Sequence, residues 1–321
     1  MIVRVDFQNF WNNFEGKYNG GLTRSLIKLL EEDGIEFKLE KENPDIIFFS
    51  VFSPIKYQGK ALKIGYVTEP MTWFKQMHEK IAEKYFDMIV GCVPNIKSKF
   101  VKLPLYLSVS DPRNFTKDKI NSINNFIKNQ KIEFDKENKS ICVAKRFNLK
   151  FCALINSHDK FNSRTSILRK LENISFVDCP GKLNHNVKSF DDDGITKVEY
   201  LKGFIFNICP ENTYGHEGYI TEKIIQCCES GCIPIYAGTN FDELDKRFFN
   251  EDRIIRYDPS NEESLNTAYL KVKNLIENPD ELIKFYRQDA IHENAHLVVD
   301  EILENYKKRV KKLLKKNNII S

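Results

Sequence analysis

Residues 204–238 read FIFNICPENTYGHEGYITEKIIQCCESGCIPIYAG, and the order of apolar and polar segments in them indicates the fold class. The apolar run FIFNIC leads into a loop that contains Pro210, Glu211 and Asn212. A helix follows, ended by Gly231 as its C-cap, and then the strand-like run CIPIYA. Continuous apolar runs of this length are typical of strands buried on both faces of a parallel sheet. The order of strand, loop, helix and strand therefore predicts a βαβ unit.

The helix predicted over residues 219–230 has one apolar and one polar face. Four side chains recur at the spacing i, i+4, i+7 and i+8 and should pack on the sheet: Ile220, Ile224, Cys227 and Cys228. A neighbouring polar stripe follows the spacing i, i+3, i+4 and i+7: Tyr219, Glu222, Lys223 and Gln226. The polar stripe begins where the loop meets the helix, so it is the candidate for binding.

The amino-terminal end of this helix suits a nucleotide diphosphate. Unpaired N–H groups and the positive end of the helix dipole attract phosphate oxygens there. Lys223, in the first turn, adds a full positive charge, and Glu222 can accept hydrogen bonds from sugar hydroxyls. Gly215 and Gly218 allow the backbone to approach a ligand closely. The spacing alone also fits an ordinary βαβ unit with a solvated helix face.

Similar alternation of strands and helices extends over most of the 321 residues. Strand-like runs lie at residues 2–7, 45–52, 62–67, 88–90, 150–155, 174–179, 204–209 and 232–237. Gly20 and Gly21 open an amphipathic helix whose apolar face carries Leu22, Leu26, Leu29 and Leu30, and a further helix is expected at 162–171. Residues 112–140, rich in Lys and Asn, are interpreted as a helix and a charged hinge. The pattern predicts an α/β fold of two doubly wound domains, 1–140 and 141–300, that face a central cleft.

Composition excludes several classes of protein. Lys and Arg total 49 against 45 for Asp and Glu, and a net charge of +4 does not indicate a nucleic-acid partner. The mean hydropathy is −0.44, and no apolar run approaches the roughly 20 residues of a membrane span. Eight scattered cysteines without a CxxC pair, together with the absence of a signal-peptide pattern at the start, favour a reducing compartment. We expect a cytoplasmic protein.

The motif PENTxGxxGYITEKIIxxxxxGCIPIYxG resembles the donor-binding motif of the α1,3-fucosyltransferases of glycosyltransferase family 10, particularly the bacterial ones. Weaker similarity extends through NVK (186–188), NSRTSIL (162–168) and KFCALINS (150–157) back to Asp45. The resemblance implies the GT-B architecture of two Rossmann-like domains, GDP-fucose as the donor and inversion at the anomeric carbon. It also implies the donor-binding residues: Asn212, Tyr219 and Glu222 (the last two near the ribose), with Lys223 and Arg164 on phosphate. Pro210 departs from the Phe usual in the family, and we expect a local change of packing there.

The runs YVTEP (66–70) and YFDMIVG (85–91) resemble the family's strand that ends in the catalytic Glu and the strand after it. The matching residue is Glu69, at the carboxyl end of a predicted strand. A carboxylate there could take the proton from an acceptor hydroxyl as its oxygen attacks the anomeric carbon. Arg164 and Lys223 would then neutralise the charge on the leaving pyrophosphate. Glu69 could instead simply cap the segment around Pro70.

The resemblance implies transfer of L-fucose from GDP-fucose to a glycan hydroxyl, the 3-position of a GlcNAc or glucose residue. The acceptor would be an oligosaccharide of the N-acetyllactosamine kind, and neither a cofactor nor a metal ion would be required. Two alternatives stay open from the residues. One is a transferase of the same fold that uses another GDP-sugar. The other is a nucleotide-sugar- or glycan-binding protein without turnover.

Three patterns look like metal sites. HENAH (292–296) matches the zinc-protease pattern HExxH, so a zinc peptidase is a third alternative, although no third ligand follows the pattern. Asp191, Asp192 and Asp193 contain a DxD pattern, which we interpret as an N-cap and dipole partner for a helix at 194–202. The cysteines at 227, 228 and 232 lack a fourth ligand at a zinc spacing, so we place them in the core.

The last segment, residues 301–321, is strongly basic. After Glu304 it holds seven basic residues and no acidic ones. Its apolar side chains follow the helical spacing i, i+4, i+7 and i+8: Tyr306, Val310, Leu313 and Leu314. A basic amphipathic helix of this kind is able to rest on an anionic membrane surface, at about 1 kcal/mol per basic residue. Alternatively, its apolar stripe packs on the first domain.

Overall fold

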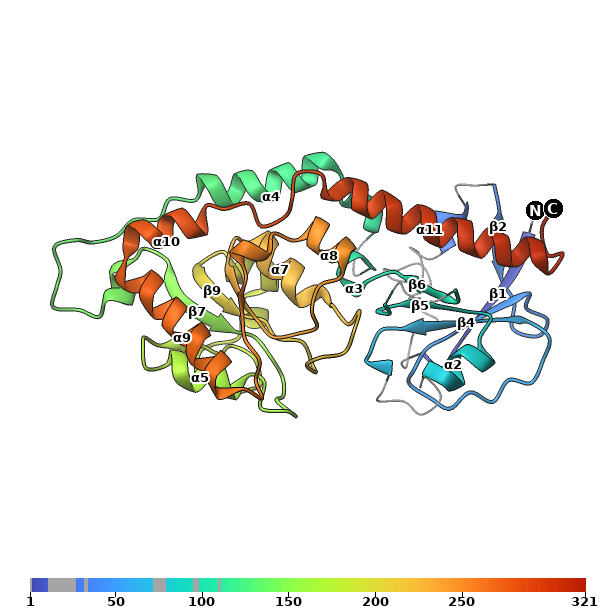
Figure 1. Cartoon of the computed structure of the whole chain (residues 1–321), viewed down its shortest axis with the longest axis horizontal. Coiled ribbons are helices and arrows are strands. Elements are labelled where there is room, and N and C mark those ends of the chain that lie inside the picture. The colour runs from blue at the N-terminus through green and yellow to red at the C-terminus, as the bar shows by residue number, and fades with distance from the viewer. Residues whose placement is uncertain (1, 11–26, 32–33, 72–78, 95–97, 109–110) are drawn as a thin grey trace. The chain divides into compact units, whose positions relative to one another are not determined.

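The computed structural model describes residues 2–10, 27–31, 34–71, 79–94, 98–108 and 111–321, drawn in colour in Figure 1. The chain forms two compact units. The first comprises Met1–Phe115, His216–Thr221 and His296–Ser321, and the second comprises Thr116–Gly215 and Glu222–Ala295. Each unit contains a parallel sheet with helices packed on it, as the alternating pattern predicts.

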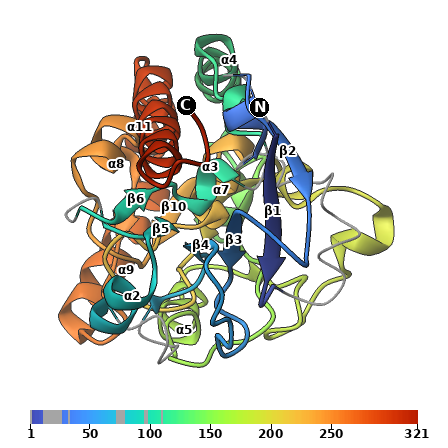
Figure 2. The same ribbon diagram turned by 90° about the vertical axis from the view of Figure 1, so that its right-hand side faces the viewer.

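Within the described residues, the first unit is built on a six-stranded parallel sheet with the order β2-β1-β3-β4-β5-β6. Its strands are β1 (Ile2–Gln8), β2 (Glu36–Leu39), β3 (Ile46–Phe49), β4 (Leu62–Val67), β5 (Met88–Gly91) and β6 (Phe100–Lys102). Figure 2 shows them side by side from β2 to β6. Every residue of β3 is buried, because helices and loops cover both faces of the sheet there.

This sheet is accompanied by α2 (Glu79–Tyr85), α3 (Leu105–Ser108) and α11 (Ala295–Lys316), whose first residue belongs to the second unit. Of the helix predicted from Gly20 and Gly21, residues 20–26, with Leu22 and Leu26, lie outside the described residues. Residues 27–31 are helical, and Leu29 and Leu30 are buried as predicted.

The second unit contains a parallel sheet that has, among the described residues, five strands in the order β11-β10-β9-β7-β8. They are β7 (Lys150–Leu154), β8 (Val177–Asp178), β9 (Phe204–Ile208), β10 (Ile233–Tyr236) and β11 (Ile255–Arg256). The chain passes from β7 outward to β8 and then crosses back to β9 on the other side of β7. The strand order therefore reverses between β7 and β9, and ligands of open α/β sheets bind beside such a reversal, outside the carboxyl ends of the strands.

The helices of the second unit are α4 (Lys117–Asn129), α5 (Thr165–Leu171), α6 (Lys197–Leu201), α7 (Glu222–Ser230), α8 (Glu243–Phe248), α9 (Glu262–Glu277) and α10 (Pro279–Tyr286). The helix expected within 112–140 is α4. Its buried Asn124 donates to the carbonyl of Ile291 at 2.8 Å and accepts from the N–H of Ala290 at 3.1 Å. These bonds attach α4 to the second unit, which begins at Thr116, earlier than the predicted boundary at 140.

The structure corrects two local expectations. The helix expected from residue 219 begins at Glu222, and His216–Thr221 joins the first unit instead. The three aspartates 191–193 do not cap a helix. They form the 3₁₀ turn η6 (Phe190–Asp193), and Thr196 caps α6 in a capping box with Glu199. A Thr hydroxyl and a Glu three residues later satisfy two N–H groups reciprocally, which the aspartates, farther upstream, cannot do.

α11 packs its apolar stripe on the first unit. Tyr306, Val310 and Leu314 are fully buried, and Tyr306 lies close to Tyr66 of β4. These three apolar side chains therefore pack on the first unit, which was one of the two alternatives for the basic C-terminal segment. Across the part of the chain that is described, no helix combines the length and apolarity that a membrane crossing requires.

Candidate active site

Glu69 and Tyr219, both predicted site residues, meet in the first unit. Glu69 follows the end of β4 by two residues and is half-buried. The hydroxyl of Tyr219, a side chain only 2% exposed, donates a hydrogen bond of 3.0 Å to Oε2 of Glu69. A residue of the predicted donor motif thus orients the carboxylate that was predicted to act as the base.

The segment before Tyr219 is held by a close backbone contact. Gly218 has a φ of +76°, and a Cβ on it would lie 2.5 Å from the carbonyl carbon of Val93 and 2.7 Å from the nitrogen of Pro94. The thiol of Cys92 lies 3.7 Å from the carbonyl oxygen of Ile220. Only glycine permits both this φ and this approach. The contact explains why residues 216–221 leave the helical pattern.

Arg164 and Asn212 meet in the second unit, where the strand order reverses. Arg164 precedes α5, which follows β7, and Asn212 lies in the loop after β9. Nη2 of Arg164 donates to Oδ1 of Asn212 at 2.9 Å, and Nη1 donates to the carbonyl oxygen of His158. The carboxylate of Asp159 accepts from the N–H groups of Arg164 and Thr165 and so caps α5. Arg164 is only 2% exposed, so its position is tightly defined.

Lys223 lies at the start of α7 and is 9% exposed. Its Nζ is 3.5 Å from Oε2 of Glu211 and 3.8 Å from Oε1 of Glu222. Glu211 is fully buried, and its Oε1 accepts a 3.1 Å hydrogen bond from the hydroxyl of Tyr236. A buried carboxylate needs such partners because water no longer solvates it.

The surroundings of Lys223 keep it charged. Burial by itself lowers the pKa of this lysine, but the carboxylates of Glu211 and Glu222 outweigh burial. Its pKa is consequently raised above the ordinary value, although the positive charge of Arg164 acts in the opposite direction. Lys223 therefore offers a positive charge at neutral pH, as a phosphate-binding group must.

Sequence reasoning missed three residues of this region. One is Glu211, which the sequence places in the loop, but whose burial is not visible in the spacing. Lys197, at the start of α6, lies within electrostatic reach of Glu222 and Lys223, and burial lowers its pKa. His158 also has a lowered pKa, through partial burial and the charges of Arg164 and Lys160. Neither belongs to a quoted motif, and their proximity to these charges depends on the fold rather than on a local pattern.

The patterns that resemble metal sites do not assemble into one. Among the described residues, no group of three or more His, Cys, Asp or Glu side chains is arranged to hold a metal ion. His292 precedes α11, and its N–H donates to the carbonyl of Phe248, so HENAH does not place two histidines on one helix. Glu293 lies 3.7 Å from Nζ of Lys117. Cys227, Cys228 and Cys232 are buried in the core, as predicted.

The family model "Glycosyltransferase family 10 (fucosyltransferase) C-term" matches residues 144–308, just over half of the chain. The protein belongs to glycosyltransferase family 10. The match spans Arg164, Asn212 and the segment from Tyr219 to Lys223, and it confirms the family that the donor motif indicates.

A curated family 10 relative is the alpha-(1,3)-fucosyltransferase FucT of Helicobacter pylori, 26% identical over 323 aligned residues. The alignment covers 94% of this chain but 60% of that protein, so the chain spans about three fifths of the relative's length.

Solved structures of α1,3-fucosyltransferase share the fold of this family 10 member. One of them aligns over 97% of this chain and 90% of its own length, with a TM-score of 0.64 and 18% sequence identity. A second, solved with GDP-fucose, aligns over 96% of this chain and 90% of its own length, with a TM-score of 0.63 and 18% sequence identity. A third was solved with GDP and has a TM-score of 0.64. The likeness confirms the predicted α/β, GT-B fold class.

Proposed function

We propose that the protein transfers L-fucose from GDP-fucose to a hydroxyl group of a glycan, with inversion at the anomeric carbon. The observation that carries the proposal is the hydrogen bond from Tyr219 to Glu69 in a member of the fucosyltransferase family. It joins a residue of the donor motif to a carboxylate at the end of a strand. A general base must be held in a defined orientation to accept a proton, and this hydrogen bond supports that role for Glu69.

In the proposed reaction, Glu69 accepts the proton of the acceptor hydroxyl. The hydroxyl oxygen attacks the anomeric carbon of fucose from the face opposite the nucleotide, and a new C–O bond forms. The bond from that carbon to the β-phosphate oxygen breaks, and GDP leaves with its electron pair. Tyr219 keeps the carboxylate oriented, and that orientation contributes to the rate because the base need not be aligned again at each turnover.

On the donor side, we assign Arg164 and Lys223 to the pyrophosphate. Each is buried and held by an oxygen ligand, Asn212 for Arg164 and Glu211 for Lys223. Charge-assisted hydrogen bonds from positioned cations stabilise a leaving phosphate oxygen. Glu222 and Tyr219 are assigned to the ribose. With two cations opposite the leaving group, we propose that turnover needs neither a metal ion nor a cofactor.

The donor is tested by thermal shift and by transfer assays with GDP-fucose, GDP-mannose, GDP and UDP-galactose. A ligand at 100 times its dissociation constant stabilises a protein by about 2.7 kcal/mol, which is measurable as a rise in Tm. We expect stabilisation by the guanine nucleotides and turnover of GDP-fucose alone. Turnover of GDP-mannose would indicate another GDP-sugar enzyme, whereas binding without turnover would indicate a non-catalytic protein.

The proposed acceptor is an N-acetyllactosamine-like oligosaccharide, fucosylated at the 3-position of its GlcNAc or glucose residue. This assignment rests on the family alone, in which the H. pylori relative bears the name α-(1,3)-fucosyltransferase. NMR of the product distinguishes the linkages. A fucose attached at the 2- or 4-position would contradict the assignment while leaving the donor proposal intact.

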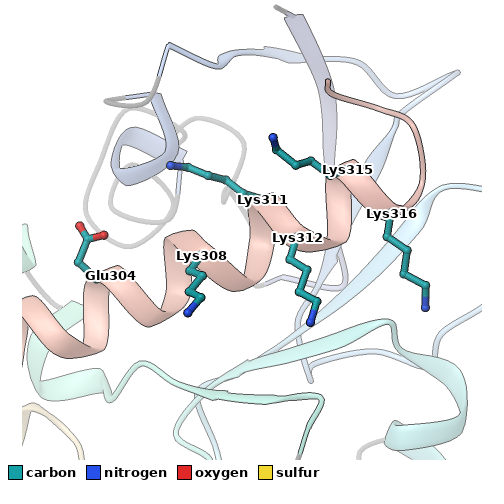
Figure 3. Close-up of a pocket in the computed structure, with 6 residues that line it drawn as sticks. All are labelled: Glu304, Lys308, Lys311, Lys312, Lys315 and Lys316. Carbon is teal, nitrogen blue, oxygen red and sulfur yellow. The ribbon is translucent and has the colours of Figure 1, made fainter.

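We further propose that the protein works in the cytoplasm and that the lysine side of α11 holds it at an anionic membrane surface. Because the apolar stripe of the helix is buried, this contact would be electrostatic. Figure 3 shows Lys308, Lys312 and Lys316 projecting to one side of α11, and Lys311 and Lys315 to another. Within the described part of the chain, Lys308, Lys312 and Lys316 form no ion pair.

Sedimentation with vesicles tests this second proposal. We expect binding to phosphatidylserine vesicles at low salt, release at high salt, and no binding to phosphatidylcholine. Changing Lys308, Lys312 and Lys316 together to Glu should abolish sedimentation. Changing the exposed lysines 131, 136 and 139 of the second unit to Glu alters the net charge equally and should not. Salt-insensitive binding, or none, would contradict the proposal.

A further inference from the structure

The last part of the donor motif, IPIYAG (233–238), holds two residues that the proposed reaction does not use. Tyr236 ends β10 and Gly238 follows it by two residues, and both are buried in the second unit. The end of β10 stays paired with the loop after β9, because the N–H of Glu211 donates to the carbonyl oxygen of Ala237 at 2.8 Å. Tyr236 and Gly238 therefore lie beside the loop that carries Glu211.

The hydroxyl of Tyr236 controls the direction of a buried carboxylate. It donates a 3.1 Å hydrogen bond to Oε1 of Glu211, while the other oxygen, Oε2, lies 3.5 Å from Nζ of Lys223. The two oxygens of one carboxylate thus face partners on β10 and on α7. Because a carboxylate is planar, a hydrogen bond that holds Oε1 also restricts where Oε2 can lie. The tyrosine therefore helps to determine the position of the negative charge beside Lys223.

Burial makes this hydrogen bond hard to replace. Glu211 is fully buried, so water cannot readily take the place of the tyrosine hydroxyl, and a buried carboxylate that loses a donor is costly. Burial and the charge of Glu211 raise the pKa of Tyr236, so the phenol stays protonated and remains a donor. The hydroxyl is consequently a permanent partner of the carboxylate at neutral pH.

Three neighbours define the place of the Tyr236 ring. Cζ of Arg256 lies 5.5 Å from the ring centre, and the ring of Phe241 is centred 6.1 Å away. The third neighbour is Gly238, where a Cβ would lie 2.3 Å from the hydroxyl oxygen and 2.5 Å from Cζ of the tyrosine. Gly238 is not among the glycines with positive φ, so a side chain there would act through this contact and not through backbone strain. Glycine thus leaves the hydroxyl its path to Glu211.

We propose that Tyr236 is a positioning residue for the phosphate ligand Lys223, that it acts through Glu211, and that Gly238 provides the space it needs. The hydroxyl holds one oxygen of the carboxylate, and the other oxygen then holds the ammonium group where the pyrophosphate binds. Without the hydroxyl, the carboxylate can turn and the ammonium group loses its fixed place. A cation that is already positioned stabilises the leaving phosphate oxygen without reorganisation. The inference rests on the proposed function, because it takes Lys223 to bind the pyrophosphate of the donor.

Removal of the hydroxyl alone tests this inference. Tyr236→Phe keeps the ring and deletes the donor to Glu211. We expect its affinity for GDP to fall by about tenfold, the lower end for one hydrogen bond to a charged group, because the effect reaches the ligand indirectly. In the Lys223→Met, Glu211→Gln double variant, which lacks both charges, Tyr236→Phe should leave the affinity for GDP unchanged. A purely structural role for Tyr236 would lower the affinity in both backgrounds.

Gly238→Ala provides a second test through a different atom. The added methyl group must displace the Tyr236 ring, so the affinity for GDP should fall about as far as in Tyr236→Phe, and the combined variant should lose little more. Gly203→Ala is its control, because Gly203 also lacks a positive φ and a Cβ there meets the carbonyl oxygen of Tyr200 at an ordinary 3.6 Å. The control should bind GDP like the wild type. Fully additive losses in the combined variant would overturn the role of Gly238.

Tyr286→Phe is the matched control for the tyrosine. It removes a hydroxyl from another buried tyrosine of the second unit, and within the described residues that hydroxyl makes no hydrogen bond. We expect it to bind GDP like the wild type. The inference is overturned by an unchanged affinity in Tyr236→Phe, by an equal loss in Tyr286→Phe, or by an equal loss in both backgrounds, whereas GDP binding by the wild type still supports the proposed function. If the wild type fails to bind GDP, the proposed function fails first and the inference fails with it.

Discussion

The hydroxyl of Tyr219 donates a 3.0 Å hydrogen bond to the carboxylate of Glu69, although 150 residues separate the two in sequence. Both belong to the first unit, which Tyr219 joins through the short segment His216–Thr221. Two residues after that segment comes Lys223, whose partner Glu211 lies in the second unit. One stretch of chain therefore carries both the residue that orients the proposed base and one of the proposed phosphate ligands.

Replacing Glu69 separates chemistry from binding. Glu69→Gln should lower kcat by about 10²–10⁴-fold, the usual contribution of a general base, and leave GDP affinity unchanged. Transfer assays and calorimetric titration with GDP measure the two effects. A parallel loss of GDP affinity would assign Glu69 a structural or donor-binding role.

Tyr219→Phe isolates the hydrogen bond to Glu69 because the ring, and hence its packing, is kept. We expect kcat to fall by about tenfold, the effect of losing one hydrogen bond to a charged group. The fall in kcat caused by Tyr219→Phe should be smaller in the Glu69→Gln background, because the acceptor of the hydrogen bond is then uncharged. Equal losses in both backgrounds would mean that Tyr219 acts independently of Glu69.

Substitutions of Lys223 and Glu211 should have non-additive effects on the free energy of unfolding. Their effects on GDP affinity should not depend on one another. Lys223→Met leaves Glu211 buried without its cation, and unfolding free energy should fall by about 3–5 kcal/mol. Adding Glu211→Gln removes the stranded charge and should restore much of that stability, whereas GDP affinity stays low in both variants. Denaturant unfolding and GDP titration form the double-mutant cycle. Purely additive stability changes would argue against the pair.

Gly218 and Gly215 provide a matched test of the loop. Both have positive φ, +76° and +79°, but a Cβ on Gly215 meets nothing within 4 Å, whereas one on Gly218 meets the backbone of Val93 and Pro94. Gly218→Ala should therefore lower Tm more than Gly215→Ala and also reduce transfer, because Tyr219 follows directly. Similar effects in the two variants would show that strain in φ, rather than the contact, controls the loop.

Binding of GDP-fucose should take up protons near pH 6. In the free protein, the pKa of His158 lies below its ordinary value of 6.5, through partial burial and the charges of Arg164 and Lys160. A bound pyrophosphate offsets those charges and raises that pKa, so affinity should increase as pH falls from 7 to 6 and stay level above 7.5. Titration in buffers of different ionisation enthalpy measures the uptake. His158→Gln keeps the carbonyl that Arg164 uses and should abolish the pH dependence.

Metal removal should have no effect. We expect EDTA to change neither Tm nor transfer, and His292→Ala to behave like the wild type, because His292 lies outside α11. A loss of activity in EDTA that Mg²⁺ or Mn²⁺ restores would require a metal-dependent mechanism.

Much of the architecture could be predicted locally. Continuous apolar runs located β3, β4, β9 and β10 because strands covered on both faces admit few polar residues. The long donor motif indicated the family, which the match over residues 144–308 confirms. Helix starts were less predictable. Thr196 rather than the aspartates caps α6, since capping depends on backbone geometry as well as on residue type.

The fold class, the family and the segment that carries the candidate donor residues could be predicted without coordinates, because these depend on local periodicity and on a motif of consecutive residues. Three features became evident only in the folded chain: Tyr219 lies outside the helix and binds Glu69, Glu211 is the buried partner of Lys223, and the apolar stripe of α11 is buried. Each of these features depends on contacts between residues that are distant in sequence, such as the contact of Gly218 with Val93. The free energy of such contacts cannot be inferred from a local sequence pattern.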